Sequence, residues 1–248
     1  MPSEHGGWSL TAEPALLGLI VAWSWAGLAL GLAAMVAFLA RTPLKLVLVD
    51  SWRHRKLDRT RLAARIAAGE LIVFALFVGL AVAWAESGFW VPLAVAAPLV
   101  GLELWFDMRS RSRRLVPELA GSIGIGSIAT AIALAGGTDA RVAWGLWVVI
   151  AARSLAAIPY VRTQILRAKS RPGPRWHSDG AQLVAVIAAV AGWQFDLIPV
   201  AAAITIAAVA AINLAAVRLA PQRAVVIGVQ QIVVGIAVIT VAALAVLA

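Results

Sequence analysis

The segment Val49-Asp50-Ser51-Trp52-Arg53-His54-Arg55-Lys56-Leu57-Asp58-Arg59-Thr60-Arg61 separates two long apolar runs, 27–48 and 66–85. Each run has roughly the 20 residues that an α-helix needs to cross the hydrocarbon core of a bilayer. The charged segment therefore predicts a loop in water that joins two transmembrane helices. Apolar runs and charged connections alternate along the rest of the chain, which predicts an all-α, polytopic membrane helix bundle.

The composition agrees with a protein whose solvent is the lipid bilayer. Hydrophobic residues make up 62% of the chain and charged residues only 13%, a balance that soluble domains of this length do not show. The chain has no cysteine, which excludes disulfides, thiolate metal sites and a cysteine nucleophile.

We predict about nine transmembrane helices from the apolar runs. They cover 11–25, 27–48, 66–85, 89–106, 117–136, 141–160, 180–196, 198–217 and 223–246. The whole chain, 1–248, then forms a single integral membrane domain with a short N-terminal segment, 1–10. That segment has no basic run before an apolar core, so we expect it to be retained and not cleaved as a signal peptide.

Basic residues gather in alternate connections. The connections after the second, fourth, sixth and eighth helices hold Arg53, Arg55, Lys56, Arg59, Arg61 and Arg65, then Arg109, Arg111, Arg113 and Arg114, then Arg162, Arg167, Lys169, Arg171 and Arg175, then Arg218 and Arg223. Because basic loops stay on the cytoplasmic side, we expect an N-terminus inside and a C-terminus outside the cytoplasmic (inner) membrane of a bacterium. This distribution accounts for the net charge of +9 without a nucleic-acid partner.

The polar residues inside the predicted helices lie toward the cytoplasmic side. Glu70, Glu103 and Glu118 lie within a turn or two of that boundary, where they either snorkel to water or face the interior. Arg153 lies about two turns deep, and we expect it to pair with one of these glutamates. Other polar residues in or near this half are Gln182, Asn213, Gln230 and Gln231. The pattern predicts a polar cavity that opens to the cytoplasm and is closed outside.

Histidines and carboxylates form the candidate metal site. Asp50, His54 and Asp58 recur every four residues, so a continuous helix would place them on one face. His5 and His177 also lie at the predicted cytoplasmic side. Imidazole and carboxylate together bind transition metals, and histidine ligates haem. The alternative is that histidines, being polar, simply collect at the wet end of the bundle.

Arginines near this face are candidates for binding a diphosphate, because a guanidinium group presents forked donors that match phosphate oxygens. Arg53, Arg59 and Arg61 flank the acidic face, and Arg162 follows Tyr160 by two residues. The alternative is that the basic loops serve only topology and anionic lipid head groups.

The run Gly121-Ser122-Ile123-Gly124-Ile125-Gly126 begins a membrane helix and follows no strand, so it predicts close helix packing and not a dinucleotide site. Glu118 precedes the run, and the neighbouring glycines would leave room for a ligand beside it.

Three motifs resemble the YwiC-like family of bacterial membrane proteins, whose function is poorly defined. They are Glu4-His5-Gly6-Gly7-Trp8 with the following Pro14, then Pro117-Glu118-Leu119-Ala120-Gly121-Ser122, and Arg153 followed by Pro159-Tyr160-Val161-Arg162. These motifs span roughly the first two thirds of the chain.

The topology also resembles the UbiA superfamily of intramembrane prenyltransferases. That resemblance implies Asp-rich motifs in the loops after helices two and six, which hold Mg²⁺ and an isoprenyl diphosphate above a lateral cavity. Asp50 and Asp58 would hold the metal–diphosphate, and Glu118 would orient the acceptor. The chain departs from the pattern because His54 replaces a carboxylate and Asp179 is the only acid in the second loop. Since Mg²⁺ is held by oxygen ligands, this departure argues against ordinary prenyl transfer.

Two functions follow from these observations. The first is a prenyltransferase-like transferase that acts on an isoprenoid or another amphiphile, with Arg153 and Tyr160 in the substrate site. The second is a non-catalytic binding, assembly or accessory subunit for a quinone, haem or lipid in a respiratory membrane complex, with a partner protein or a second copy of the chain. A transporter is a third reading, but the apolar outer half offers no exit.

Overall fold

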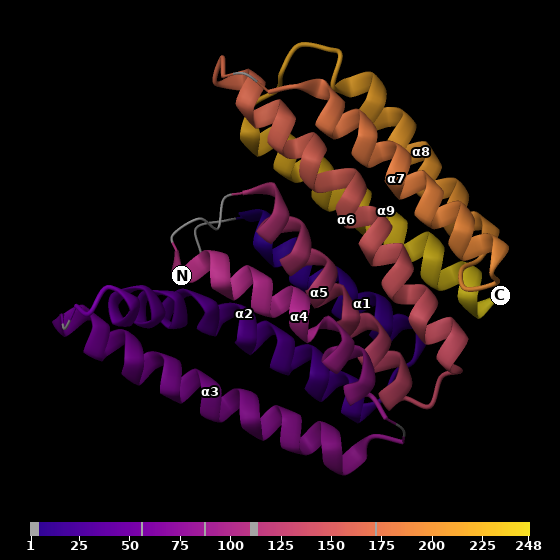
Figure 1. The fold of residues 1–248 in the computed structure, drawn as a ribbon. Helices are drawn as coiled ribbons and strands as arrows, with labels where there is room; N and C mark the ends of the chain where they lie inside the picture. The colour runs from indigo at the N-terminus through magenta and orange to yellow at the C-terminus, as the bar shows by residue number, and fades with distance from the viewer. Residues whose placement is uncertain (1–4, 56, 87, 110–113, 172) are drawn as a thin grey trace. The chain divides into compact units, whose positions relative to one another are not determined.

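The structure is a computed structural model that describes residues 5–55, 57–86, 88–109, 114–171 and 173–248, with side chains from residue 8 onward. Every regular element in these ranges is an α-helix, which confirms the all-α prediction (Figure 1). The helices are α1 (His5–Val21), α2 (Trp25–Trp52), α3 (Asp58–Trp84), α4 (Trp90–Met108), α5 (Leu115–Ala135), α6 (Ala140–Ala168), α7 (Arg175–Gln194), α8 (Val200–Ala216) and α9 (Ala224–Leu247).

The helices are those of a multi-pass membrane protein. Within the described residues, α2, α3, α4, α5, α6 and α9 are long and apolar enough to cross a bilayer, while α8 and the part of α1 from Trp8 are shorter apolar helices. Large apolar side chains cover the outside of α3, including Leu62, Ile72 and Leu76, which are all exposed. Such a surface is stable against lipid and unstable against water.

The chain divides into two compact units, Met1–Thr138 and Asp139–Ala248. We call them unit 1 and unit 2 and describe each by itself. The expectation that 1–248 forms one membrane domain stays a prediction.

In unit 1, α5 lies at the centre and packs against α1, α2 and α4, while α3 packs on α2. Small residues make this close packing possible. A Cβ atom on Gly18 of α1 would lie 2.8 Å from Cβ of Ile132 in α5, and one on Gly124 of α5 would lie 3.2 Å from Val100 in α4. The prediction that the glycine run serves helix packing is confirmed.

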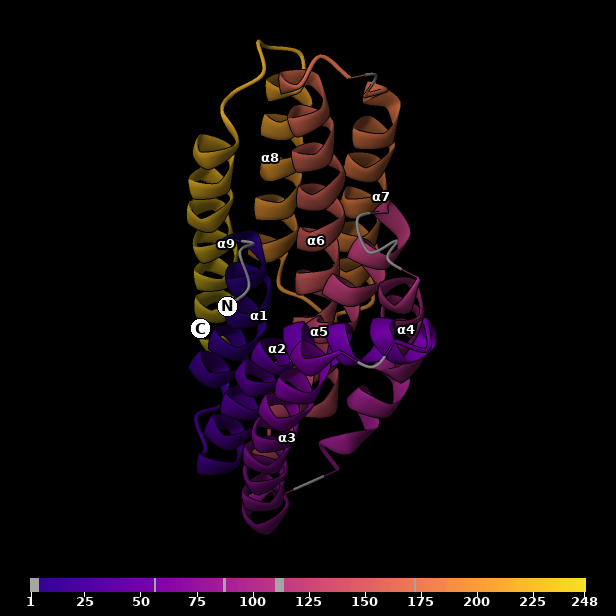
Figure 2. The same ribbon diagram turned by 90° about the vertical axis from the view of Figure 1, so that its left-hand side faces the viewer.

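In unit 2, α6 packs against α7, α8 and α9, and the four helices run roughly side by side (Figures 1 and 2). Their shared interior contains small apolar residues, such as Ala152, Ala185 and Ala202, together with several fully buried polar side chains.

The turn between α2 and α3 interrupts the charged segment. α2 ends at Trp52, and His54 adopts a left-handed conformation with φ of 52°. The backbone N–H of His54 donates to the carbonyl of Ser51 at 3.0 Å, and that of Arg55 donates to the carbonyl of Asp50 at 2.8 Å. This is a Schellman motif, which ends a helix. The segment therefore does not continue one helix, and the condition under which Asp50, His54 and Asp58 would share one helical face is not met.

Candidate functional site

Asp50 ties α2 to α3. It lies in the last turn of α2 and is only 2% exposed. Its carboxylate accepts a hydrogen bond from Oγ1 of Thr60 at 2.6 Å and one from Nη2 of Arg59 at 3.5 Å, and both donors come from the first turn of α3. The sequence singled out both Asp50 and Arg59, as candidates for binding a metal and a diphosphate, and those roles stay predictions. The contacts show that Asp50 closes the α2–α3 hairpin.

The other residues of the predicted metal site lie apart from Asp50. Asp58 is fully exposed and lies 4.0 Å from Nη1 of Arg61, and His54 is exposed in the turn. His177 is exposed at the start of α7 and stacks on Trp176 with 3.8 Å between ring centroids, while the side chain of His5 lies outside the described residues. In the part of the chain that the structure describes, no three His, Asp or Glu side chains come together as a metal site. Their metal-binding and catalytic roles stay predictions.

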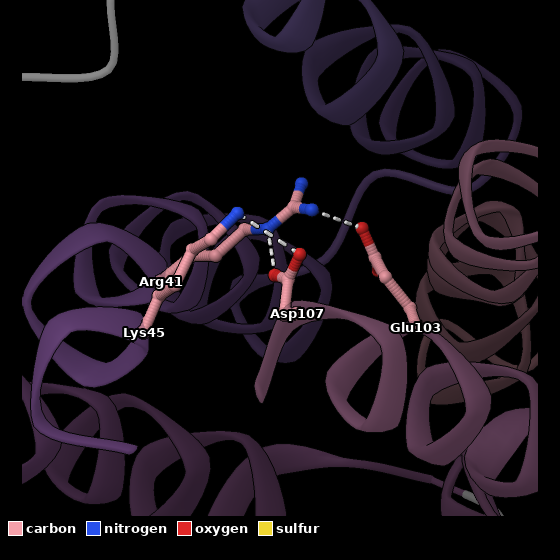
Figure 3. A network of polar contacts seen from close by, with 4 residues as sticks. All are labelled: Arg41, Lys45, Glu103 and Asp107. Atoms are coloured by element: carbon pink, nitrogen blue, oxygen red, sulfur yellow. Dashed lines mark hydrogen bonds and ion pairs between the residues drawn. The ribbon is translucent and has the colours of Figure 1, made fainter. Parts of the chain in front are cut away.

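Unit 1 contains a four-residue ionic network that joins α2 to α4 (Figure 3). Asp107 is 1% exposed, and its two carboxylate oxygens accept from Nε of Arg41 at 3.2 Å and from Nζ of Lys45 at 3.1 Å. Nη2 of Arg41 also lies 2.5 Å from Oε1 of Glu103. The network balances two cations with two carboxylates, which lowers the cost of burying Asp107 away from water.

Gly121 on α5 provides the space for Glu103. A Cβ atom at residue 121 would lie 2.6 Å from Oε1 of Glu103 and closer still to Oε2 and Cδ. The glutamate carboxylate therefore occupies the volume that any larger residue would need. The sequence predicted that glycines here leave room for a ligand beside Glu118, and the structure fills the space at Gly121 with a side chain of α4.

Three members of the network, Arg41, Lys45 and Asp107, were not predicted from the sequence. A signal for them existed, because Arg41 and Lys45 are separated by four residues on α2 and Glu103 and Asp107 by four residues on α4. Residues four apart lie on the same face of a helix. Two such pairs of opposite charge, both in or beside predicted membrane helices, indicate two helix faces that attract each other.

An open cleft of about 400 Å³ lies where α2 and α4 end. It is lined by Trp52, Arg53, Met108 and Arg109. The guanidinium carbon of Arg109 lies 4.2 Å from the centroid of the Trp105 ring, one turn back along α4. This cation–π contact holds the Arg109 cation at the cleft.

The polar residues of unit 2 form hydrogen bonds between its helices. Arg153 is 2% exposed and donates to Oε1 of Gln231 at 3.2 Å and to the Gln231 carbonyl at 2.7 Å. The carbonyl of Ala156, one turn on, accepts from Gln182 at 2.7 Å and from Asn213 at 3.1 Å. These contacts connect α6 with α7, α8 and α9, while the expected pairing of Arg153 with a glutamate stays a prediction.

Tyr160 lies one turn after Ala156 on the same face of α6. Its ring packs on Val217 and Ile227, and its hydroxyl accepts from Nε2 of Gln164 at 3.4 Å. Of the other predicted substrate-binding residues, Arg162 is partly buried on α6. Glu118, the predicted catalytic residue on α5, is partly buried in the first turn of that helix.

A model of the YwiC-like protein family matches residues 1–133. The chain belongs to this family. The match covers α1 to α4 and most of α5 of this YwiC-like protein, and so includes the ionic network, Gly121 and the cleft. The motif around Arg153 and Tyr160 lies beyond the matched range. No curated protein and no solved structure matches the chain, and the UbiA-like topology stays a prediction.

Proposed function

We propose that this membrane protein binds an amphiphilic ligand, a lipid, quinone or isoprenoid, at the end of unit 1 where α2 and α4 end. We propose further that it acts as a binding or accessory protein and not as a metal-dependent prenyltransferase. The observation that carries the proposal is the cleft lined by Trp52, Arg53, Met108 and Arg109. It combines two cations with an indole and a thioether at the end of apolar helices, which suits a ligand with a polar head and an apolar tail.

The hydrogen bonds that the nearby carboxylates already accept favour ligand binding over metal-dependent prenyl transfer. The oxygens of Asp50 accept from Thr60 and Arg59, and those of Asp107 accept from Arg41 and Lys45. Mg²⁺ would have to compete with these donors for its oxygen ligands. The guanidinium groups of Arg53 and Arg109 are of the kind that binds an anionic head group through forked N–H donors.

The positions of the basic connections support placing this end of unit 1 in the cytoplasm. The ligand would then enter from the inner leaflet of the bacterial membrane, whose apolar phase adjoins the exposed side chains of α3 and α4. A partner subunit or a second copy of the chain remains part of this proposal.

Extraction of the purified protein tests the proposal. The full chain is purified in a mild detergent, and co-purifying lipids, quinones and isoprenoids are identified by mass spectrometry after organic extraction. We expect one amphiphile to be enriched over bulk membrane lipid and to be reduced about tenfold in the Arg53→Ala/Arg109→Ala variant. The control is Arg141→Ala, because Arg141 is an exposed arginine in the first turn of α6 and belongs to no predicted site. Equal ligand content in all three proteins would refute the proposed site, and Mg²⁺-dependent turnover of an isoprenyl diphosphate would refute the non-catalytic role.

A further inference from the structure

Helix α3 has an exposed face that follows a heptad pattern. One side of α3 packs on α2, and its other sides carry exposed apolar residues (Figure 1). Along one of these sides, exposed residues recur at alternating spacings of four and three, namely Leu62, Ile66, Gly69, Val73, Leu76 and Leu80. These are the spacings of positions a and d in a heptad repeat, which form the contact seam of two helices that cross at a shallow angle.

Gly69 distinguishes this face from a surface that only contacts lipid. Apolar residues alone do not indicate a partner, because lipid covers such a face as well as a second helix does. A Cβ atom at Gly69 would meet no atom within 4 Å in the described residues, so packing within unit 1 does not require a glycine there. Glycine is unfavourable inside a helix. On the outer face of a membrane helix it lets a second helix approach closely.

Two charged residues flank the same face. With Ile66 at position a, Arg65 occupies position g and Glu70 position e. Arg65 is exposed, whereas Glu70 is partly buried one turn farther into the predicted membrane span. Oε2 of Glu70 is enclosed and accepts no hydrogen bond from the described residues. The residues three and four positions before and after Glu70 are all apolar, so α3 itself offers no cation within a turn. A carboxylate at this depth is costly without a cation.

We infer that α3 is the contact surface between two copies of this chain, related by a twofold axis along the membrane normal. The inference is independent of the amphiphile proposed above. Both copies cross the membrane in the same direction, so their α3 helices lie parallel. In a parallel pair, position g of one helix lies beside position e of the next heptad in the other, five residues on. Arg65 of each copy then meets Glu70 of the other, and the symmetry forms this ion pair twice.

The spacing and the charges favour a second copy over an unrelated helix. Five residues of an α-helix span about 7.5 Å along its axis, which the extended side chains of arginine and glutamate bridge together. Any partner of this face must offer a cation at the depth of Glu70 and an acid at the depth of Arg65. The chain's own α3 offers both at the required spacing.

Disulfide crosslinking of single-cysteine variants tests the surface, since the natural chain has no cysteine. Val73→Cys and Leu76→Cys place a thiol on the seam, whereas Leu71→Cys and Ala75→Cys place one on other exposed sides of α3. The full-length variants are oxidised in their native membranes with copper phenanthroline and separated on a non-reducing gel. We expect about fivefold more dimer from the seam variants than from the controls, because positions a and d lie opposite their own copies at the axis.

Charge reversal tests the ion pair. In the Leu76→Cys background, Arg65→Glu and Glu70→Arg each bring like charges together, and each should reduce the crosslinked dimer about fivefold. The two variants are then expressed in one membrane with different tags. The crosslink between the two tags should recover, because one copy carries two acids and the other two cations.

Each contrary result overturns a stated part of the inference. Equal crosslinking at the seam and control positions, or no dimer from any of the four cysteine variants, would overturn the surface. A crosslinked product whose mass differs from that of two chains would identify another protein as the partner and overturn the second copy. Crosslinking that is insensitive to the charge reversals, or that does not recover in the mixed membrane, would overturn the pairing of Arg65 with Glu70.

Discussion

Replacing Gly121 by alanine should disrupt the Arg41–Glu103 ion pair between α2 and α4 and leave the ion pairs of Asp107 in place. The new Cβ would lie 2.6 Å from Oε1 of Glu103 and closer to two other atoms of that carboxyl group. The carboxyl group must then move away, because a carbon and an oxygen cannot approach so closely. Movement of Glu103 removes it from Nη2 of Arg41, which now lies 2.5 Å away.

The size of the effect follows from exposure and helix propensity. The side chains of Arg41 and Glu103 are 37% and 18% exposed, so their ion pair is intermediate between a surface pair and a buried pair. A surface pair contributes up to about 1 kcal/mol to stability, and disrupting a buried pair costs about 3–5 kcal/mol. We assign about 2 kcal/mol to its loss, discounted for the exposure of Arg41. Alanine is favoured over glycine inside a helix by about 1 kcal/mol. Gly121→Ala should therefore lower the free energy of unfolding by about 1 kcal/mol.

A double-mutant cycle separates these two contributions. In the Glu103→Ala background the carboxyl group is gone, so Gly121→Ala should be neutral or stabilising by up to about 1 kcal/mol. The coupling between the two substitutions should be about 2 kcal/mol. Equilibrium unfolding of the purified protein by SDS in mixed micelles measures all four free energies. A coupling below about 0.5 kcal/mol would refute the reasoning, because it would show that residue 121 and Glu103 are energetically independent.

Three further predictions concern the hairpin, the interior of unit 2 and the topology. Thr60→Val should lower the SDS concentration at which half of the protein is unfolded, because Asp50 loses its shortest hydrogen bond. Thr60→Ser keeps the hydroxyl and should retain the wild-type midpoint. Equal midpoints for the two variants would contradict the role of Asp50 in closing the hairpin. Gln182→Leu and Asn213→Leu should each lower the free energy of unfolding by about 1 kcal/mol, because the Ala156 carbonyl keeps one donor in either variant. The double variant should lose more than the sum of the two single losses. Strict additivity would argue against a shared acceptor. Alkaline phosphatase fused to the C-terminus should be active and green fluorescent protein at the same position dark, and the reverse result would place the C-terminus in the cytoplasm.

The helices were predictable because apolar runs of membrane length have few alternatives to helix in lipid. The predicted bounds were short at the charged ends. α3 begins at Asp58 and not at residue 66, and α6 continues to Ala168 and not to residue 160. Apolar runs mark what lies in lipid, whereas helical hydrogen bonding continues through arginine and other good helix formers beyond the lipid.

The break in the charged segment was not predictable from spacing. A helix commonly ends with glycine in the left-handed conformation, and here His54 adopts that conformation instead. The regular recurrence of Asp50, His54 and Asp58 gave no sign of where the helix ends, although the charge of the segment predicted a loop between the two helices. A pattern of period four describes a face only where the backbone remains helical.

The candidate site was predictable in part. The sequence located the charged connection after α2 and named Asp50 and Arg59 as candidates, but it gave them metal and phosphate roles and did not predict that they pair with each other. It did not reveal the network around Asp107, because the choice of partner between α2 and α4 depends on how the two helices pack. It also did not reveal that Gly121 accommodates Glu103, since only the packed structure shows which side chain fills a glycine's space.

The central claim is that an amphiphile binds at the ends of α2 and α4. Photo-crosslinking of the full-length protein in nanodiscs tests it most directly. Three diazirine-bearing probes are used, a phospholipid, a quinone and an isoprenoid, and the crosslinked peptides are mapped by mass spectrometry. We predict that the crosslinks of at least one probe concentrate in the peptides that contain Trp52–Arg53 and Leu104–Arg109, and that an excess of the same unlabelled amphiphile suppresses them. An even spread of crosslinks over the lipid-facing helices would contradict the claim. So would crosslinks that concentrate in unit 2 and are suppressed by the unlabelled competitor.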